Sequence, residues 1–314
     1  MKLAFVILAH RYPEQLARLV KLLSSDGDDC LIHIDRRAAA LLEQTQRLLG
    51  DLVRTPQVVF VKQRSACRWG QFSIVNATLN CLNQMRQQAQ HSGYSEPYDY
   101  IVLISGQCYP IKPLAQIKRF LAAHRGQQFI EAFPILEPNP WTEQAGPYQA
   151  ARRVFNWHGF FRSRHFYLPF QRTLPKGLIP YGGSQWWALS GDCVAYLLAE
   201  LDAHPEVIQY FKYTFIPDEL FFQTLVANSP FQTALANRCL TYLDWSNPNP
   251  TPPKVLGLED FEQLANSDYL FARKFDPHRS QDLLTLIDQR LLSPPKASSL
   301  PRDASLPRDD SELC

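Results

Sequence analysis

Two adjacent carboxylates, Asp218 and Glu219, stand directly after Pro217 at the start of an apolar stretch. Proline suits the first position of a helix, and acidic residues are favoured in a first helical turn, where the helix dipole is positive. A carboxylate fixed at such a turn could act as a general base that takes a proton from a nucleophile. The same pattern also fits a simple helix start, in which Asp218 is the better placed residue to cap the helix.

His10 and Asp35 each follow an apolar run of strand length, residues 3–9 and 30–34. Runs that are apolar on both faces, alternating with amphipathic helical patterns, predict an α/β fold with a mainly parallel sheet covered on both sides. Ligands bind such sheets at the carboxyl ends of the strands. His10 and Asp35 are therefore candidate ligand-binding residues, and Asp35 is suited to ribose hydroxyls, although either side chain could instead cap its own loop.

Motifs for bound phosphates or metals are missing where they would be expected. No GxGxxG or GxxxxGK[ST] pattern occurs, so neither a dinucleotide fold nor a P-loop is predicted. The strand that the sequence predicts most clearly, residues 98–104, is followed by Ser105-Gly106-Gln107-Cys108, which contains no acidic metal motif. The literal DxD sequence is Asp26-Gly27-Asp28, in the turn before the second strand. Because hard cations need several converging oxygen ligands, we expect no metal there.

Aromatic residues interleaved with arginines fill residues 134–180, which we expect to be irregular in structure. Long loops of this kind are often walls or lids of binding sites. Their aromatic rings could stack on nucleobases or on the apolar faces of sugars, or could form a small core of their own. The next stretch, residues 181–190, reads as a strand opened by glycines, which allow a ligand to approach the backbone closely.

The composition is that of an ordinary globular protein. Of 314 residues, 46% are hydrophobic and 20% charged, enough for one large core or two modest ones. We expect a single domain over residues 1–292 and a disordered, low-complexity tail over 293–314, rich in Ser, Pro and charge. The formal net charge of +2 points to no polyanionic partner, and with no nucleic-acid module signature we expect none of that class.

The cysteines and the hydropathy give an expected location. Seven scattered cysteines with no CxxC pair favour reduced thiols over a disulfide framework or a zinc site. No apolar run reaches the ~20 residues of a membrane span, and the first residues lack the pattern of a signal peptide. We therefore expect a cytoplasmic protein, either free or peripheral at the inner face of the membrane.

A set of short motifs, in order and spacing from about Leu3 to Asp276, resembles one family: the core-2/I-branching β-1,6-N-acetylglucosaminyltransferases with the related peptide O-xylosyltransferases. The motifs are Leu8-Ala9-His10, Ile32-His33-Ile34-Asp35, Trp69-Gly70, Ser105-Gly106 with Tyr109-Pro110-Ile111-Lys112, Gly183-Ser184-Gln185-Trp186-Trp187, Pro217-Asp218-Glu219 and Leu270-Phe271-Ala272-Arg273-Lys274-Phe275-Asp276.

The resemblance implies a GT-A-like fold, with a Rossmann-like nucleotide-binding half and an acceptor half. It also implies an inverting, metal-independent enzyme without cofactor that transfers N-acetylglucosamine, or a related sugar, from a UDP-sugar to a glycan hydroxyl. Glu219 falls on the family's general base, and Lys274 on the lysine that contacts the donor diphosphate in place of a metal. The full set of expected donor-binding residues is His10, Asp35, Lys254, Arg273 and Lys274, in which Lys254 substitutes for an upstream arginine of the family. The expected acceptor-binding residues are Glu131, Ser184, Gln185, Trp186 and Trp245.

Cys108 departs from the family pattern, which usually has Asp at this position. In the xylosyltransferase branch that Asp approaches the acceptor hydroxyl. A cysteine thiol is largely neutral at pH 7 and is a poor replacement for that carboxylate. Cys108 therefore makes a peptide O-xylosyltransferase-like enzyme the less favoured function, and this enzyme is the alternative. A non-catalytic protein that binds nucleotide-sugars or glycans is a further alternative. A glycoside hydrolase needs two carboxylates flanking one bond, whereas the side chains of Asp218 and Glu219 should diverge.

Overall fold

The computed structural model describes residues 1–92, 98–162, 164–246 and 253–293, so all but the first residue of the expected tail lies outside the described residues. The strands are β1 (Leu3–Ala9), β2 (Asp29–Ile34), β3 (Val58–Phe60), β4 (Tyr100–Ser105), β5 (Cys108–Pro110), β6 (Phe133–Pro134), β7 (Asn156–Phe161), β8 (Arg164–Gln171), β9 (Tyr181–Gly182), β10 (Trp187–Ser190), β11 (Thr241–Leu243) and β12 (Phe271–Arg273). The α-helices are α1 (Pro13–Leu23), α2 (Ala39–Leu49), α3 (Ser73–Ser92), α4 (Leu114–Ala123), α5 (Pro140–Ala145), α6 (Pro147–Phe155), α7 (Gly191–Ala203), α8 (Pro205–Phe211), α9 (Phe221–Ala227), α10 (Phe261–Asn266) and α11 (Pro277–Ile287).

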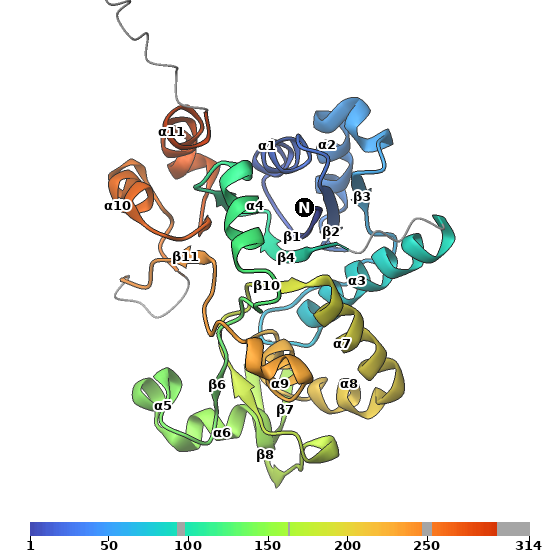
Figure 1. Ribbon diagram of the computed structural model, residues 1–314. Coiled ribbons are helices and arrows are strands. Elements are labelled where there is room, and N and C mark those ends of the chain that lie inside the picture. Colours follow the sequence, from blue (N-terminus) through green and yellow to red (C-terminus); the bar gives the residue numbers. More distant parts are fainter. Residues whose placement is uncertain (93–97, 163, 247–252, 294–314) are drawn as a thin grey trace, which may run out of the picture.

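The main sheet has the strand order β10-β4-β1-β2-β3 (Figure 1). Strands β1 to β4 are parallel, and β10 joins β4 antiparallel. In β1, Phe5 and Ile7 enter one buried cluster, whereas Ala4 and Val6 enter another on the opposite face. Both faces are buried because successive side chains of a strand point to opposite sides. The prediction of a mainly parallel sheet is confirmed.

Helices cover both faces of this sheet. The cluster that contains Phe5 includes buried residues of α1, α2, α4 and α11, and the cluster that contains Val6 includes buried residues of α3, α7 and α9. The expected α/β class, GT-A-like with helices flanking a mainly parallel sheet, is confirmed. Among the described helices, none has both the length and the apolar character needed to cross a membrane.

A small sheet with the order β11-β12-β5 extends the carboxyl edge of the main sheet. Strand β5 follows β4 after a two-residue turn, and β12 pairs antiparallel with it, so that Arg273 lies opposite Cys108. Strand β11 runs parallel to β12 on its other side. This pairing carries the end of β12, and with it Arg273 and Lys274, to the end of β4.

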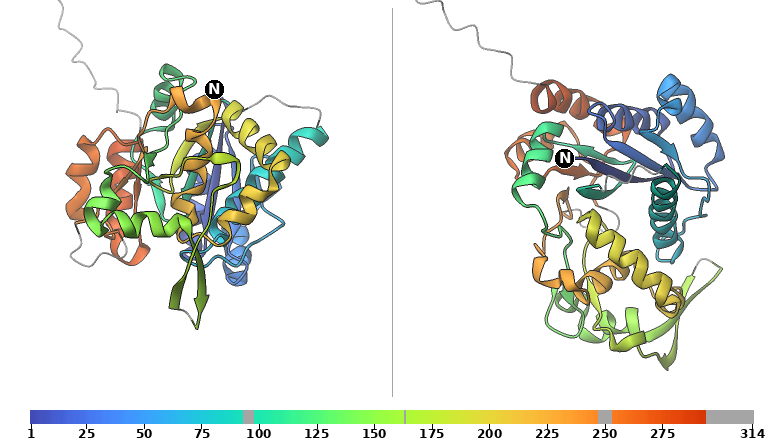
Figure 2. Two further views of the ribbon diagram at one scale, coloured as in Figure 1. Left: turned by 90° about the horizontal axis from the view of Figure 1, so that it is seen from below. Right: turned by 45° about the vertical axis from the view of Figure 1, so that its right-hand side comes forward.

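Residues 134–180 are more regular than we expected from their composition. They form the short helices α5 and α6 and the hairpin β7–β8, which extends away from the body of the molecule (Figure 2). Helix α5 begins where Asn139 caps its first turn and Pro140 takes the first position, a signal that the sequence carried. The single strand expected over 181–190 is also wrong, since β9 and β10 are separated by a break at 183–186.

Candidate active site

The Pro217–Glu219 turn is a single 3₁₀ turn, and α9 begins only at Phe221. It is fixed by the N–H of Gly183, which donates to the backbone oxygen of Glu219 at 3.0 Å. Just before it, Ile216 has φ of 51°, a left-handed conformation that is rare for a β-branched residue. Such conformations persist where the surroundings impose them, and they cluster at active sites. The turn therefore presents Glu219 in a defined position.

Asp218 does not cap the following helix, contrary to the sequence-based expectation. Neither the 3₁₀ turn nor α9 has a side-chain cap. The Asp218 side chain is instead only 8% exposed, and its Oδ1 atom has no hydrogen-bond partner among the described residues. Burial raises the pKa of this carboxyl, against the effect of its own backbone N–H. Asp218 is thus a buried acid beside Glu219.

Glu219 lies in an environment that favours its protonated form. Burial raises the pKa of Glu219 well above its usual range, and the charges of Asp218 and Glu131 raise it further. Arg153 opposes this rise, with its Nη1 atom 3.9 Å from Oε2 of Glu219. The side chain of Glu219 is still 32% exposed, so a substrate can reach it. A reachable carboxylate with a raised pKa suits proton abstraction, because its basicity is higher than that of a free glutamate.

Glu131 lies near Glu219, since its charge acts on that carboxyl, and the backbone N–H of Ser184 bonds to Glu131. The expected acceptor-binding role of both residues stays a prediction. Burial raises the pKa of Glu131, and the backbone N–H of Ser184 lowers it. Gly183 allows the close approach, because a Cβ atom there would lie 1.9 Å from the backbone oxygen of Glu131. The side chain of Gln223 donates to the backbone oxygen of Ser184 at 2.6 Å, which anchors the break between β9 and β10 to α9.

Cations gather at the carboxyl ends of β1 and β12. Burial lowers the pKa of Lys274, and the charges of Arg273 and Arg11 lower it further. The same three cations, after burial, hold the pKa of His10 at about 4, and the neutral ring accepts a hydrogen bond from Arg11 Nε at 2.9 Å. Among the described residues, none of the three cations forms a salt bridge. This group, Arg11, Arg273 and Lys274, is called the cation cluster below, and it is suited to an anion.

Asp276 does not neutralise the cation cluster, although its charge acts on Lys274. Its carboxylate instead accepts a hydrogen bond from the hydroxyl of Tyr12 and caps the first turn of α11. The acid is therefore occupied in holding α11 against the loop after β1, and the cations beside it stay available to a ligand.

Asp35 lies beside this cluster, since its charge also acts on His10. Burial would raise the pKa of Asp35, but hydrogen bonds from Arg37 and the backbone N–H of Cys67 lower it. Both carboxylate oxygens are engaged, one by the N–H of Arg37 at 2.8 Å and the other by its guanidinium at 2.8 Å. Asp35 therefore fixes its own loop, one of the two roles that the sequence allowed, and its expected role in binding the donor stays a prediction.

Arg273 connects the cation cluster with the segment that approaches Glu219. Its guanidinium donates to Oγ of Ser105 at the end of β4. It also lies over the ring of Trp186, 4.6 Å from the ring centroid, and Trp186 is buried. Trp186 therefore ties the break at 183–186 to Arg273, and Gln185 precedes it, half-buried. The expected acceptor-binding role of both residues stays a prediction.

The structure places Lys254 differently from its expected role. Its Nζ atom lies 2.6 Å from Asp260, 3.8 Å from Asp244 and 3.9 Å from Glu259, so its charge is already neutralised. Arg11, which directly follows His10, is a further cation beside Lys274 that the sequence-based analysis did not single out.

Trp245 is also not brought to the candidate base. It is 60% exposed just beyond β11, and no contact among the described residues ties it to Glu219. Its expected role in binding the acceptor therefore stays a prediction.

Cys108 is fully buried and belongs to the turn rather than to the surface of the site. Its Sγ atom accepts from the N–H of Ser105 and lies 3.3 Å from Oγ of the same residue. The literal DxD turn is likewise structural, because Asp26 and Asp28 both bind Nζ of Lys118, at 2.6 and 2.9 Å. Within the described parts of the chain, no group of three or more His, Cys, Asp or Glu side chains is arranged to hold a metal ion.

A pocket of about 510 Å³ opens beside Arg153. We call it the Arg152 pocket; it is lined by Gln149, Arg152, Arg153, His165, Phe166, Tyr167 and Phe215. Since Arg153 also faces Glu219, this pocket adjoins the candidate base. Six of its seven lining residues belong to residues 134–180, which the sequence analysis marked as a possible wall of a binding site. The local patterns did not show that α6, β8 and Phe215, just before the Pro217 turn, meet there.

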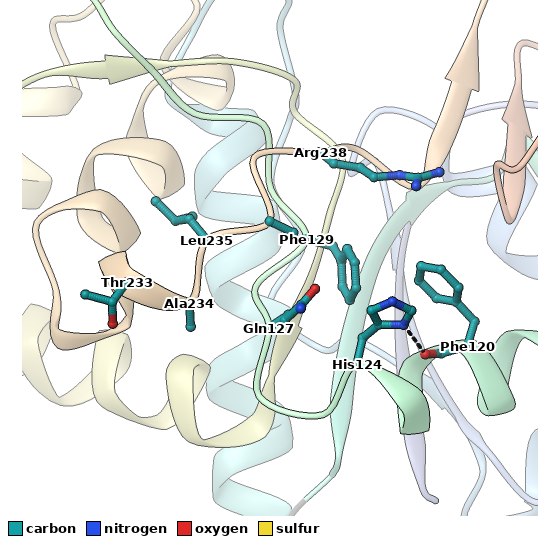
Figure 3. A pocket seen from close by; sticks show the side chains of 9 residues that line it. Phe120, His124, Gln127, Phe129, Thr233, Ala234, Leu235 and Arg238 are labelled. Atoms are coloured by element: carbon teal, nitrogen blue, oxygen red, sulfur yellow. Dashed lines mark hydrogen bonds between the residues drawn. The ribbon is translucent and has the colours of Figure 1, made fainter.

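A second pocket, of about 380 Å³, lies elsewhere (Figure 3). His124, Phe120 and Phe129 line it, with Arg238 at its edge. The hydroxyl of Tyr100, at the start of β4, donates to the backbone oxygen of His124 at 2.7 Å. This pocket is therefore at the amino end of β4, opposite the edge that carries the cation cluster, and it is not part of the candidate site.

Comparison with known proteins gives one family match. The model of the family described as "Core-2/I-Branching enzyme" matches residues 3–265. Xylosyltransferase 1 of Canis lupus familiaris is 25% identical over 317 residues, which cover 93% of this chain and 31% of that protein. Xylosyltransferase oxt of Drosophila melanogaster is 25% identical over 324 residues, which cover 94% and 34% respectively. The chain thus spans about a third of the length of these relatives.

Among solved structures, the crystal structure of mouse xyloside xylosyltransferase 1 in its apo form aligns over 87% of this chain and 97% of that chain, at 10% identity. Its TM-score of 0.36 is too low to support an argument.

Proposed function

Because the chain belongs to the core-2/I-branching enzyme family, we propose that it is an inverting glycosyltransferase. It moves N-acetylglucosamine, or a related sugar, from a UDP-sugar to a hydroxyl group of a glycan or glycoconjugate. One observation carries the proposal: Glu219 is a reachable carboxylate with a raised pKa, and the segment of Gly183 and Trp186 joins it to Arg273, a cation that forms no salt bridge with any described residue. A base for the acceptor and a charge for the leaving group are the two things that such a transfer needs.

In the proposed reaction, Glu219 takes the proton of the acceptor hydroxyl while that oxygen attacks the anomeric carbon of the donor sugar. The bond from the anomeric carbon to the diphosphate oxygen breaks on the opposite face, so the configuration inverts and UDP leaves. Negative charge grows on the departing diphosphate. Fixed cations aimed at that charge stabilise it without needing to reorganise, as a metal ion would.

We assign the donor diphosphate to the cation cluster and the nucleoside to the strand ends at His10 and Asp35. Within the described residues, Arg11 and Lys274 have no acidic side chain in a salt bridge with them, whereas Lys254 is held by three carboxylates. On this basis the reaction proceeds without a metal. The acceptor enters from the side of Glu131 and Ser184, whose positions next to Glu219 support that assignment.

The second candidate is a peptide O-xylosyltransferase-like enzyme, which the names of the relatives favour. Cys108 is the observation against it, because the buried thiol at this position cannot replace an acceptor-facing carboxylate. The third candidate, a non-catalytic protein that binds nucleotide-sugars or glycans, predicts donor binding without turnover.

The deciding experiment measures UDP release with a panel of UDP-sugars, including UDP-N-acetylglucosamine and UDP-xylose, each with glycan and with serine-peptide acceptors. Turnover with UDP-N-acetylglucosamine and a glycan supports the leading proposal, and turnover with UDP-xylose and a peptide supports the second. UDP binding without release in any combination supports the non-catalytic candidate. The cytoplasmic location is part of the proposal, supported by free thiols at the described cysteines, and cell fractionation tests it.

A further inference from the structure

The Arg152 pocket has a floor and walls made of aromatic rings. His165 stacks on Phe215 with ring centroids 4.6 Å apart and an interplanar angle of 11°. Tyr167 meets the same Phe215 edge-on, with centroids 5.9 Å apart. This packing buries Phe215 and fixes the wall, whereas Phe166, which also lines the pocket, is 43% exposed and offers flat apolar surface that matches the C–H face of a pyranose ring. The pocket volume of about 510 Å³ is within the range of sites for small ligands.

The charge of the pocket is positive and largely uncompensated. Arg152 lies over the ring of Tyr167, 4.1 Å from its centroid, and forms no salt bridge with any described residue. Arg153 has Glu219 as its acidic neighbour, at 3.9 Å, and lies over the ring of Trp141 at 4.3 Å. No acidic residue is among the described residues that line the pocket. A ligand that brings a carboxylate would therefore meet two guanidinium groups, one of them without an acidic partner.

We propose that the Arg152 pocket binds a carboxylate-bearing sugar of the acceptor glycan, next to the sugar whose hydroxyl Glu219 activates. This inference rests on the proposed function, because it takes the acceptor to lie beside Glu219. The planar guanidinium of Arg152 matches a carboxylate with two parallel hydrogen bonds. The ring of Tyr167 holds that guanidinium from behind, so it is oriented before the acceptor arrives. An acidic sugar is thus the class of acceptor that this pocket selects.

The aromatic walls favour a saccharide over an acidic peptide. A peptide segment rich in Asp or Glu would satisfy the charge of Arg152 but would leave the exposed ring of Phe166 without an apolar partner. An acidic pyranose satisfies both at once. The two classes can be separated by direct binding.

The test is calorimetric binding of trigalacturonate, galactotriose and pentaglutamate to the full chain without any donor, in about 0.15 M salt, where charges more than about 8 Å apart are screened. We expect trigalacturonate to bind at least about tenfold more tightly than galactotriose. Arg152→Gln should reduce that preference by about tenfold. Arg152→Lys should keep part of it, since lysine retains the charge but lacks the planar guanidinium that donates two parallel hydrogen bonds. Arg164→Gln removes the same charge from the same hairpin region but outside the pocket, and it should change the affinity by less than about twofold.

Equal binding of the two trisaccharides, or an equal loss in the Arg152→Gln and Arg164→Gln proteins, overturns the proposal. Pentaglutamate binding as tight as that of trigalacturonate overturns the choice of a saccharide. Thermal melts of each variant establish that it is folded, and the wild-type preference stands as a test by itself if Arg152→Gln does not fold. The result is separate from catalysis: UDP release on neutral glycans without a preference for trigalacturonate rejects this inference alone. Binding of trigalacturonate that depends on Arg152, without UDP release on any acceptor, rejects the proposed function alone.

Discussion

The guanidinium of Arg153 lies 3.9 Å from the carboxylate of Glu219 and also lines the Arg152 pocket. One side chain thus touches both the candidate base and the space where an acceptor would extend. Since Arg153 opposes the pKa rise that burial imposes on Glu219, the basicity of the carboxylate depends on a residue that an acceptor would contact.

Glu219→Gln should lower kcat by about 10²–10⁴, because the amide cannot take the proton of the acceptor hydroxyl. UDP affinity should stay near the wild-type value, since the cation cluster is untouched. Calorimetry and UDP-release assays check both. Near-normal turnover in a folded Glu219→Gln protein would assign the base to another residue.

Glu219→Gln should also change how the stability of the folded protein depends on pH. The folded-state pKa of Glu219 is raised, so the folded protein binds this proton more tightly than the unfolded chain does. The stability that Glu219 contributes is therefore fully present below its unfolded pKa and is lost as pH rises through the raised value. Gln cannot titrate. Thermal melts should accordingly show Glu219→Gln gaining stability relative to wild type as pH rises from acidic to neutral.

The pH dependence of kcat should have an acidic limb that reports protonation of Glu219, displaced above the usual range of a glutamate. Glu131→Gln removes a charge that raises this pKa, so it should move the limb to lower pH. Arg153→Gln removes the opposing charge, so it should move the limb to higher pH. Profiles of kcat at saturating acceptor measure both shifts. Shifts in the same direction would contradict the electrostatic account.

Lys274→Ala should weaken UDP binding by about 1–3 kcal/mol, the usual value of a charge-assisted hydrogen bond. Lys254→Ala is the matched control, because that ammonium is already paired with Asp260 at 2.6 Å. Calorimetric titration with UDP compares the two. If Lys254→Ala weakened UDP binding as much as Lys274→Ala, the assignment of the diphosphate to the cation cluster would be wrong.

Transfer should persist in the presence of a metal chelator, since the cation cluster is proposed to supply the charge that a metal supplies in other enzymes. The measurement is the initial rate of UDP release with and without EDTA, at fixed donor and acceptor. Loss of activity with EDTA and its return with added Mn²⁺ would show that the proposal of a metal-independent reaction is wrong.

Gly183→Ala should reduce both stability and turnover, because the added Cβ atom would lie 1.9 Å from the backbone oxygen of Glu131, and backbone has to move to relieve the overlap. Ser184→Ala is the neighbouring control, since it leaves the backbone geometry unchanged and should melt near wild type. A Gly183→Ala protein with wild-type melting temperature and activity would mean that Gly183 is not needed for this close approach.

Local sequence patterns determined the scaffold and the residues at its edge. Apolar runs such as residues 3–9 have to be buried on both faces, so they specify parallel strands between helices, and residues that follow them, such as His10, have to lie at the carboxyl edge. The turn at Glu219 was also visible, because Pro217 and the apolar residues after it act over a few positions.

Tertiary structure alone decided which charges are available. Lys254 and Lys274 look alike in sequence, yet the fold surrounds only the first of them with acids. Asp244 reaches Lys254 from the end of β11, and Glu259 and Asp260 reach it from the 3₁₀ turn before α10. Lys274 forms no salt bridge with any residue that the structure describes, so its charge is left for a ligand.

The same holds for the residues around the candidate base. Asp218 is buried instead of capping a helix, and Arg153 reaches Glu219 from α6, a helix far earlier in the chain. Such contacts join elements that only the packed fold brings together, and their electrostatic effect depends on burial and on distances of a few ångströms. Local patterns in the sequence encode neither quantity, which is why the sequence identified the carboxylate and the structure decided its surroundings.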